Sequence, residues 1–217
     1  MILYWTKLSS YSAKTRIACA LKRIVPELRL PPEGSYRSEA YRRIVPLGTV
    51  PALVEGDMVL SESDTIVEYL EERFPDPALL PGTARERARI RFLSRFHDLH
   101  LEPPLRALFG QAAPATRDPA IVAAQGDTFA RRLALLDGFL DDRGPFAAGP
   151  APTLADCGFP PTLAIADGLL AMLGRPPVYG PRTRRWREAV TADPRIESVM
   201  EAYRAEVAAW LAAKAAG

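Results

Sequence analysis

The chain has 217 residues, 48% of them apolar and 25% charged, which suits one large globular domain or two small ones. Its 28 basic and 26 acidic side chains give a formal net charge of +2, a balance that argues against a nucleic acid or a membrane surface as partner. No uninterrupted apolar stretch approaches the roughly 20 residues that cross a bilayer, so we expect no membrane-spanning helix.

The cysteines and the first residues favour a cytoplasmic protein. Cys19 and Cys157 are the only two cysteines, which is too few for a disulfide framework or a zinc site. The first residues are typical of a short strand and lack the basic and apolar segments of a secretory signal. His97 and His100 lie close together, but no carboxylate or cysteine cluster accompanies them, so we expect no metal.

The first part of the chain predicts a small α/β unit. Short apolar runs predict strands and apolar residues at helical spacing predict helices, with Lys14 on the polar side of the first helix. Gly56-Asp57 is a tight hairpin signal. The expected strands are 2–5, 27–30, 52–55 and 58–60, and the expected helices are 11–24, 36–44 and 63–74.

Beyond this unit the pattern is helical throughout. Pro75-Asp76-Pro77 and Pro81-Gly82 mark a linker. The expected helices are 84–110, 118–142, 154–173, 183–192 and 195–215. We therefore predict two domains, an α/β domain of residues 1–76 and an all-α domain of residues 84–217.

Ser9-Ser10-Tyr11-Ser12 is the first of three stretches that carry polar groups at places suited to binding. It lies between the first strand and the first helix, where unpaired amides and the helix dipole favour an anion. A serine there either caps the helix or donates a hydrogen bond to a bound thiolate, and four hydroxyls in a row leave room for both roles.

The other two stretches precede a strand and a helix. Pro51 opens a strand and cannot donate to a sheet. If the Val50–Pro51 bond is cis, the backbone of Val50 turns outward and can pair with an extended peptide. Before the next helix, Ser63 and the helix amides suit a carboxylate and Glu62 suits an ammonium group, although Ser63 also fits an ordinary N-cap.

Taken in order, these stretches resemble the cytosolic glutathione S-transferase superfamily, serine type, and are most similar to its zeta class. The segments that carry the resemblance are Ile2-Leu3-Tyr4, Ser9-Ser10-Tyr11-Ser12, Arg16-Ile17-Ala18, Val50-Pro51-Ala52-Leu53, Glu62-Ser63, Ile66 with Tyr69-Leu70, and Thr153-Leu154-Ala155-Asp156. The resemblance implies a thioredoxin-like N-terminal domain, an all-helical C-terminal domain, detoxification chemistry and a homodimer. It also implies glutathione as co-substrate.

Roles for the glutathione-binding residues follow from the resemblance. Ser9 is expected to donate to the thiolate, with Ser10 or an exposed Tyr11 hydroxyl as the alternative donor. The residues expected to hold the rest of glutathione are Val50 beside Pro51 for the cysteinyl part, Glu62 and Ser63 for the γ-glutamyl end, and Asp98, across a dimer interface, for the γ-glutamyl ammonium. A solvated helix charge is the other interpretation of Asp98.

A small electrophile is expected beside this site. The residues that we expect around it are Leu8, in the loop after the first strand, and Arg106 and Phe109. Arg106 would bind an anionic group and Phe109 an apolar body. The alternative is a surface arginine and a core aromatic.

The sequence departs from the family at three places. Val45 stands where the family often has Asn before a Pro-Leu-Gly turn, and Tyr11 stands where the zeta signature has Cys. Zeta isomerases carry an arginine about twelve residues beyond the capping-box Asp, where this chain has Gly168. The last departure argues against isomerisation of the maleylacetoacetate type.

Three functions other than conjugation fit parts of the pattern. Thiol–disulfide exchange is excluded, because the start of the first helix carries serines instead of paired cysteines. A glutathione-dependent isomerase of the maleylacetoacetate or maleylpyruvate type and a non-catalytic glutathione-binding protein both remain as alternatives.

Overall fold

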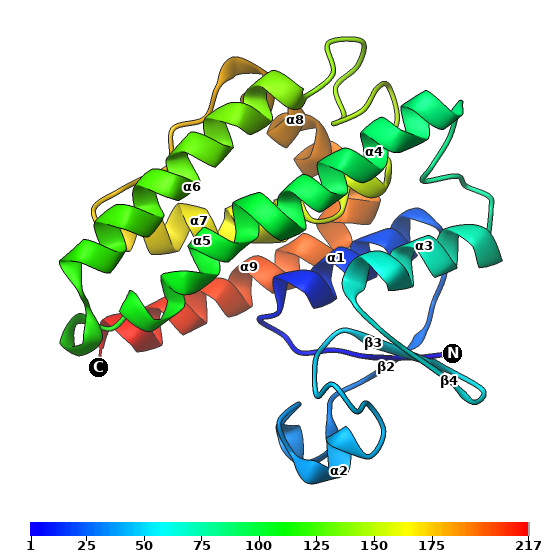
Figure 1. The fold of residues 1–217 in the computed structure, drawn as a ribbon, viewed down its shortest axis with the longest axis horizontal. Helices are drawn as coiled ribbons and strands as arrows, with labels where there is room; N and C mark the ends of the chain where they lie inside the picture. The colour runs from blue at the N-terminus through cyan, green and yellow to red at the C-terminus, as the bar shows by residue number, and fades with distance from the viewer. Residues whose placement is uncertain (217) are drawn as a thin grey trace.

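The computed structural model describes residues 1–216 and combines a four-stranded sheet with a layer of long helices. The first unit consists of β1 (Ile2–Tyr4), α1 (Ser10–Leu21), β2 (Glu27–Arg29), α2 (Glu39–Arg42), β3 (Ala52–Glu55), β4 (Met58–Ser61) and α3 (Ser63–Arg73). The helical unit consists of α4 (Ala84–Phe96), α5 (Glu102–Ala107), α6 (Pro119–Phe139), α7 (Phe159–Met172), α8 (Pro181–Ala192) and α9 (Pro194–Ala215). Figure 1 shows the sheet and α2 below and the long helices above them.

The sheet has the order β2-β1-β3-β4 and places β1 in its interior. β1 is parallel to β2 and antiparallel to β3, so that Leu3 lies opposite both Leu28 and Leu53. Leu3 and Leu53 are fully buried, which explains why these short apolar runs form central strands. One βαβ unit followed by a hairpin gives the expected thioredoxin-like arrangement.

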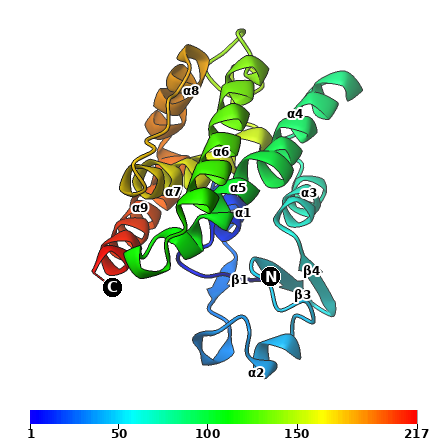
Figure 2. The same ribbon diagram turned by 60° about the vertical axis from the view of Figure 1, so that its left-hand side comes forward.

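α1 lies at the centre of the molecule, between the sheet and the helical layer (Figure 2). It packs against α3 and against α7 and α9 of the helical unit. Its buried side includes Ala13, Ile17 and Ala18, and the small residues allow neighbouring helices to approach closely. A helix that both units pack against fixes how the residues at its N-terminus face the second unit.

The expectation of one helix over 84–110 is wrong. The chain forms α4, then a π-helical turn over His97–Leu101, and then α5. Pro103 and Pro104 explain the interruption, because neither can donate an amide to the carbonyl four residues earlier. The wider turn places Asp98 and Arg106 beside the start of α1, where they line the cavity described below.

The remaining expected elements exist with boundaries that differ by a few residues. The helix expected at 154–173 begins at Phe159, after a short 3₁₀ turn over Leu154–Asp156. There the Asp156 carboxylate accepts from the backbone amide and hydroxyl of Thr153, which closes a capping box. Across residues 1–216, no helix is both long enough and apolar enough to span a membrane.

Candidate functional site

A cavity of about 640 Å³ lies where the N-termini of α1 and α3 meet the start of β3 and the π-helical turn. This volume is within the range of small-molecule sites, roughly 300–1,000 Å³. The lining residues are Thr6, Leu8, Ser9, Tyr11, Tyr36, Thr49, Val50, Pro51, Glu62, Ser63, Asp64, Thr65, Arg95, Asp98, Leu99, Arg106 and Phe109. Every site residue that the sequence predicted, except Ser10, is among them.

Ser9 caps the helix, which is one of the two roles that the sequence left open. It is the N-cap of α1, and its Oγ accepts a hydrogen bond from the amide of Ser12 at 3.1 Å. In the one hydrogen bond that this side chain makes within residues 1–216, the oxygen is the acceptor. The hydroxyl proton is therefore left to donate toward the cavity that Ser9 lines.

Ser10 and Tyr11 turn toward a buried carboxylate on α5. Ser10 is 1% exposed, and its hydroxyl donates to Glu102 Oε1 at 3.4 Å, so it lies outside the cavity. Tyr11 lines the cavity, but its hydroxyl donates to Glu102 Oε2 at 3.0 Å. Burial, and then the charges of Glu102 and Asp98, raise the pKa of Tyr11. The Tyr11 hydroxyl is therefore engaged by Glu102, and its use as the alternative donor stays a prediction.

The opposite wall of the cavity contains the starts of β3 and α3, where the sequence predicted binding residues. The Val50–Pro51 bond is cis, and Val50 lies just outside the β3 ladder, which begins at Ala52. Glu62 is exposed and has a φ of 68°, a left-handed conformation that side-chain-bearing residues rarely adopt. Ser63, the first residue of α3, is 5% exposed. The wall thus offers the backbone just before the start of β3 and a helix N-terminus beside a carboxylate.

Asp98 belongs to a cluster of charges beneath the cavity. The Lys14 ammonium is fully buried and lies 2.5 Å from Asp64 Oδ1 and 2.8 Å from Asp98 Oδ2. His97 Nδ1 lies 2.6 Å from Asp98 Oδ1. Burial alone would raise the pKa of Asp98, but the hydrogen bond with His97 and the charge of Lys14 outweigh it and hold that pKa at about 2. Asp98 is therefore an ionised member of an internal network instead of a solvated helix charge.

Arg106 and Phe109 lie together at the other end of the cavity. The Arg106 guanidinium is 5.3 Å from the centre of the Phe109 ring and 5.2 Å from that of Tyr11. Phe109 also packs against Trp210 of α9, with ring centres 5.2 Å apart. These side chains make one half of the cavity apolar and aromatic, apart from one guanidinium.

Sequence reasoning missed Lys14 and Glu102. We expected Lys14 on the polar side of its helix, but it shares a face with Ile17, Ala18 and Leu21, three, four and seven residues later. A lysine at an apolar position was the available signal for a buried ion pair. For Glu102 the available signal was its spacing of four residues from Arg106, which is typical of a helical ion pair, but its burial follows from the unforeseen π-helical turn.

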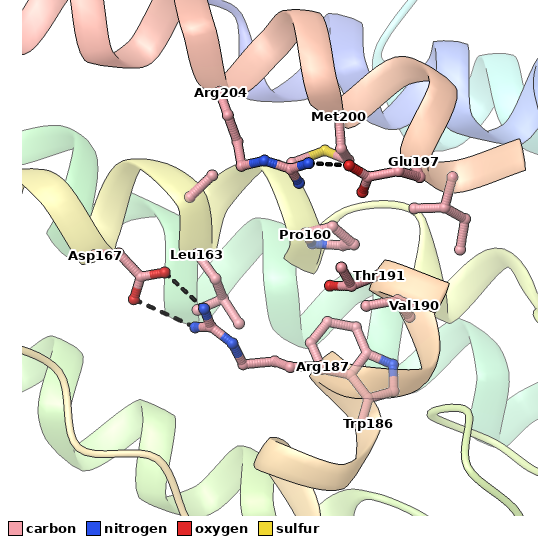
Figure 3. Close-up of a pocket in the computed structure, with 12 residues that line it drawn as sticks. Pro160, Leu163, Asp167, Trp186, Arg187, Val190, Thr191, Glu197, Met200 and Arg204 are labelled. Carbon is pink, nitrogen blue, oxygen red and sulfur yellow. Dashed lines mark hydrogen bonds and ion pairs between the residues drawn. The ribbon is translucent and has the colours of Figure 1, made fainter. Parts of the chain in front are cut away.

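A second, much smaller cavity of about 80 Å³ lies between α7, α8 and α9. Figure 3 shows that its charged side chains face one another in pairs, Arg187 with Asp167 and Arg204 with Glu197. Its volume is well below that of small-molecule sites and its charges are already paired, so it is not the candidate site.

Comparison with known proteins agrees with this geometry. The model of the glutathione S-transferase N-terminal domain matches residues 3–78. Maleylacetoacetate isomerase of Pseudomonas aeruginosa is 33% identical over 89% of this chain and 92% of its own length. Glutathione S-transferase Z1 of Arabidopsis thaliana is 42% identical, but over only 39% of this chain and 38% of its own.

Among solved structures, the holo form of a bacterial maleylpyruvate isomerase, described as a zeta-class glutathione S-transferase, superposes with a TM-score of 0.77. It is 29% identical and covers 94% of this chain and 98% of its own. The fold, the family model and the near full-length relative agree: this chain belongs to the glutathione S-transferase superfamily and is zeta-like.

Proposed function

We propose that the protein is a glutathione transferase that joins the thiolate of glutathione to a small electrophile in the larger cavity. The observation that carries this proposal is Ser9. Its hydroxyl lies at the N-terminus of α1, lines the cavity and has a proton to donate. A hydroxyl in that place, together with the helix dipole, favours a bound thiolate over a thiol.

The magnitudes are sufficient for this role. A free thiol has a pKa of about 8.5, and lowering it by two units requires about 2.7 kcal/mol. A hydrogen bond to a charged acceptor supplies about 1.5–3 kcal/mol, and a helix N-terminus adds about 0.3–1 kcal/mol. Ser9 and α1 therefore account for thiolate formation without a metal or a histidine base.

The rest of glutathione would lie along the opposite wall. The backbone of Val50 suits the cysteinyl part, and Glu62 with Ser63 suits the γ-glutamyl group, whose carboxylate would meet the N-terminus of α3. Asp98 lines the same end, but it is already paired with Lys14, so we assign it a supporting role within its own chain.

Isomerisation of the maleylacetoacetate or maleylpyruvate type is the alternative, because two of the relatives carry these names. The position of Gly168 argues against it. Gly168 supplies no side chain where zeta isomerases carry an arginine, and a Cβ atom there would meet the tip of the Leu211 side chain of α9 at 2.2 Å. Arg106 is then the cation that an anionic substrate would meet in the half of the cavity beside Phe109.

We further propose that the protein is a cytoplasmic homodimer with a role in detoxification. Both cysteines are free and buried, which suits a reducing compartment. Phe92 and Leu99, 48% and 62% exposed, are apolar side chains of α4 and the π-helical turn available to a second copy. Size-exclusion chromatography with light scattering tests the dimer, which should have twice the chain mass of 23.8 kDa.

Three measurements test the function. Millimolar glutathione should raise the melting temperature of the wild type, because a ligand that binds only the folded state stabilises it. The same protein should conjugate glutathione to chloro-dinitrobenzene faster than it isomerises maleylacetoacetate or maleylpyruvate. Faster isomerisation would favour the alternative, and stabilisation without either turnover would indicate a glutathione-binding protein.

A matched pair of variants locates the glutathione site. Ser63→Ala should weaken glutathione binding, measured by calorimetry. Ser198→Ala removes an exposed serine hydroxyl of α9 that donates to the carbonyl of Arg195, outside the cavity, and it should leave binding unchanged. Equal affinity in both variants would contradict the assignment of Ser63.

A further inference from the structure

Arg106 is the cation of the cavity's electrophile half, the end of the cavity that Tyr11, Arg106 and Phe109 line. Two arginines line the cavity, and the other, Arg95, lies 3.2 Å from Asp64 at the glutathione end. Among the described residues that surround the electrophile half, the charge of Arg106 therefore has no second cation to reinforce it. Whether this half selects an anionic or a neutral electrophile depends on how much of that charge is available.

Glu102 balances most of the positive charge of Arg106. It lies one turn before Arg106 on α5 and is 2% exposed. The Arg106 Nε donates to Glu102 Oε2 at 3.1 Å, and the terminal NH2 nitrogen donates to Oε1. This two-point ion pair is the strong geometry for a guanidinium and a carboxylate. Because a buried carboxylate without its cation is costly, the pair holds Arg106 in place.

The donors of Arg106 are also largely occupied. Its NH2 nitrogen donates to Ser10 Oγ at 3.3 Å as well as to Glu102. Of the five N–H groups of a guanidinium, the two on the other terminal nitrogen remain for a ligand. An incoming carboxylate would thus meet half of a guanidinium whose charge is balanced by a carboxylate directly behind it.

Two aromatic rings border the guanidinium, although the Arg106 side chain is 47% exposed. Its Cζ atom lies 5.2 Å from the ring centre of Tyr11 and 5.3 Å from that of Phe109, and Trp210 packs against Phe109. The Tyr11 hydroxyl donates to the same Glu102 at 3.0 Å. One buried carboxylate therefore accepts hydrogen bonds from both the guanidinium and one of its two aromatic neighbours, and it balances the charge of the guanidinium.

We propose that Glu102 is a specificity-determining positioning residue, which neutralises Arg106 and so restricts the cavity to uncharged, apolar electrophiles in preference to carboxylates. This rests on the proposed function, because it assumes that glutathione thiolate is the nucleophile. In the conjugation of an aryl chloride, sulfur forms a bond to the ring carbon while the carbon–chlorine bond breaks and its electron pair leaves with chloride.

The test compares two electrophiles that differ by one carboxylate, chloro-dinitrobenzene and chloro-dinitrobenzoate. The ratio of their kcat/KM values is measured at saturating glutathione, and each value is divided by the uncatalysed rate with glutathione in the same buffer. The wild type should favour the neutral compound by at least about tenfold, since a carboxylate loses its hydration without gaining an unbalanced cation. A wild type that favours the benzoate overturns the proposal, and this result needs no variant.

Glu102→Gln is the informative variant, because the amide keeps the size and an acceptor oxygen but removes the charge. The preference for the neutral compound should fall by about tenfold, since Arg106 is then unbalanced. Glu102→Asp keeps the charge and should keep the preference. The double variant Glu102→Gln with Arg106→Gln removes both charges and should restore a preference for the neutral compound.

Two further results separate this inference from the proposed function. A ratio that Glu102→Gln leaves unchanged, with normal turnover of chloro-dinitrobenzene, overturns the inference alone. A wild type with neither turnover nor stabilisation by glutathione overturns both. General loss of folding cannot imitate the expected result, because it lowers both rates and leaves their ratio unchanged.

Discussion

The Nζ atom of Lys14 lies 2.8 Å from Oδ2 of Asp98, which joins the first helix of the sheet unit to the π-helical turn of the helical unit. The same ammonium contacts Asp64 at the start of α3. The three side chains form the floor beneath the end of the cavity where we place the γ-glutamyl group. A substitution of Lys14 therefore tests how this floor supports both the fold and the ligand.

Lys14→Met should destabilise the protein by about 3–5 kcal/mol, because it leaves two largely buried carboxylates without their cation. For a chain of this length, that loss corresponds to a melting temperature lower by about 6–20 °C. Differential scanning calorimetry measures both quantities.

Lys7→Met is the matched control for Lys14→Met. Lys7 pairs with Glu206 at the surface, where the two side chains are 61% and 40% exposed. Surface pairs contribute about 0–1 kcal/mol, so this variant should melt within a few degrees of the wild type. Equal melting temperatures for the two variants would mean that the Lys14 ammonium does not stabilise the fold.

Asp98 should give the protein a specific sensitivity to acid. Its pKa in the folded protein is about 2, below the ordinary value of 3.8. A carboxyl group with a lowered pKa contributes stability above its unfolded pKa and loses it as the pH falls toward the folded value. The contribution, about 2 kcal/mol, should be complete at pH 5 and decline from about pH 4 toward pH 2.

Urea unfolding at several pH values compares the wild type with Asp98→Asn to isolate this contribution. The difference in the free energy of unfolding should be largest at pH 5 and should shrink as the pH falls below 4. A difference that stays constant over this range would show that ionisation of Asp98 is not linked to folding.

The sequence predicted those parts of the site whose geometry depends on residues that are adjacent in the chain. Ser9, Val50 and Ser63 were found because each stands at the start of a helix or strand, and an element's first residues are visible in the sequence. The site's other half depends on how two units pack. The contacts of Glu102 and Lys14 join segments about 90 and 50 to 84 residues apart, and no periodicity encodes such pairs.

Phe109→Ala should weaken binding of the electrophile much more than binding of glutathione. The ring lines the cavity and packs against Trp210, so its loss removes apolar surface where the substrate body would lie. KM for chloro-dinitrobenzene should rise about tenfold, consistent with the loss of roughly 1–2 kcal/mol of apolar contact, while the calorimetric affinity for glutathione stays unchanged.

Leu135→Ala is the control for Phe109→Ala. Leu135 is an apolar side chain of α6 that is 45% exposed and outside the cavity, so its removal should leave both constants unchanged. If Phe109→Ala weakened glutathione binding as strongly as it raised KM, the division of the cavity into two halves would be incorrect.

Ser9→Ala should slow conjugation without a comparable loss of glutathione affinity, since the hydroxyl is needed for the ionised sulfur and most of the tripeptide binds elsewhere. Loss of a hydrogen bond to a charged acceptor should lower kcat about 10- to 150-fold near neutral pH. The apparent pKa of bound thiol should rise by about one to two units, so the defect should diminish in alkaline buffer. The pH profile at saturating glutathione measures this shift.

Because Ser9 also caps α1, Ser9→Ala should cost about 1 kcal/mol of stability. Thr83→Ala removes the cap of α4, which is exposed and outside the cavity, and should cost a similar stability with no change in the pH profile. Ser9→Thr keeps both the cap and the hydroxyl and should recover most of the rate. A pH profile that Ser9→Ala leaves unshifted would assign thiolate formation to another donor of the cavity.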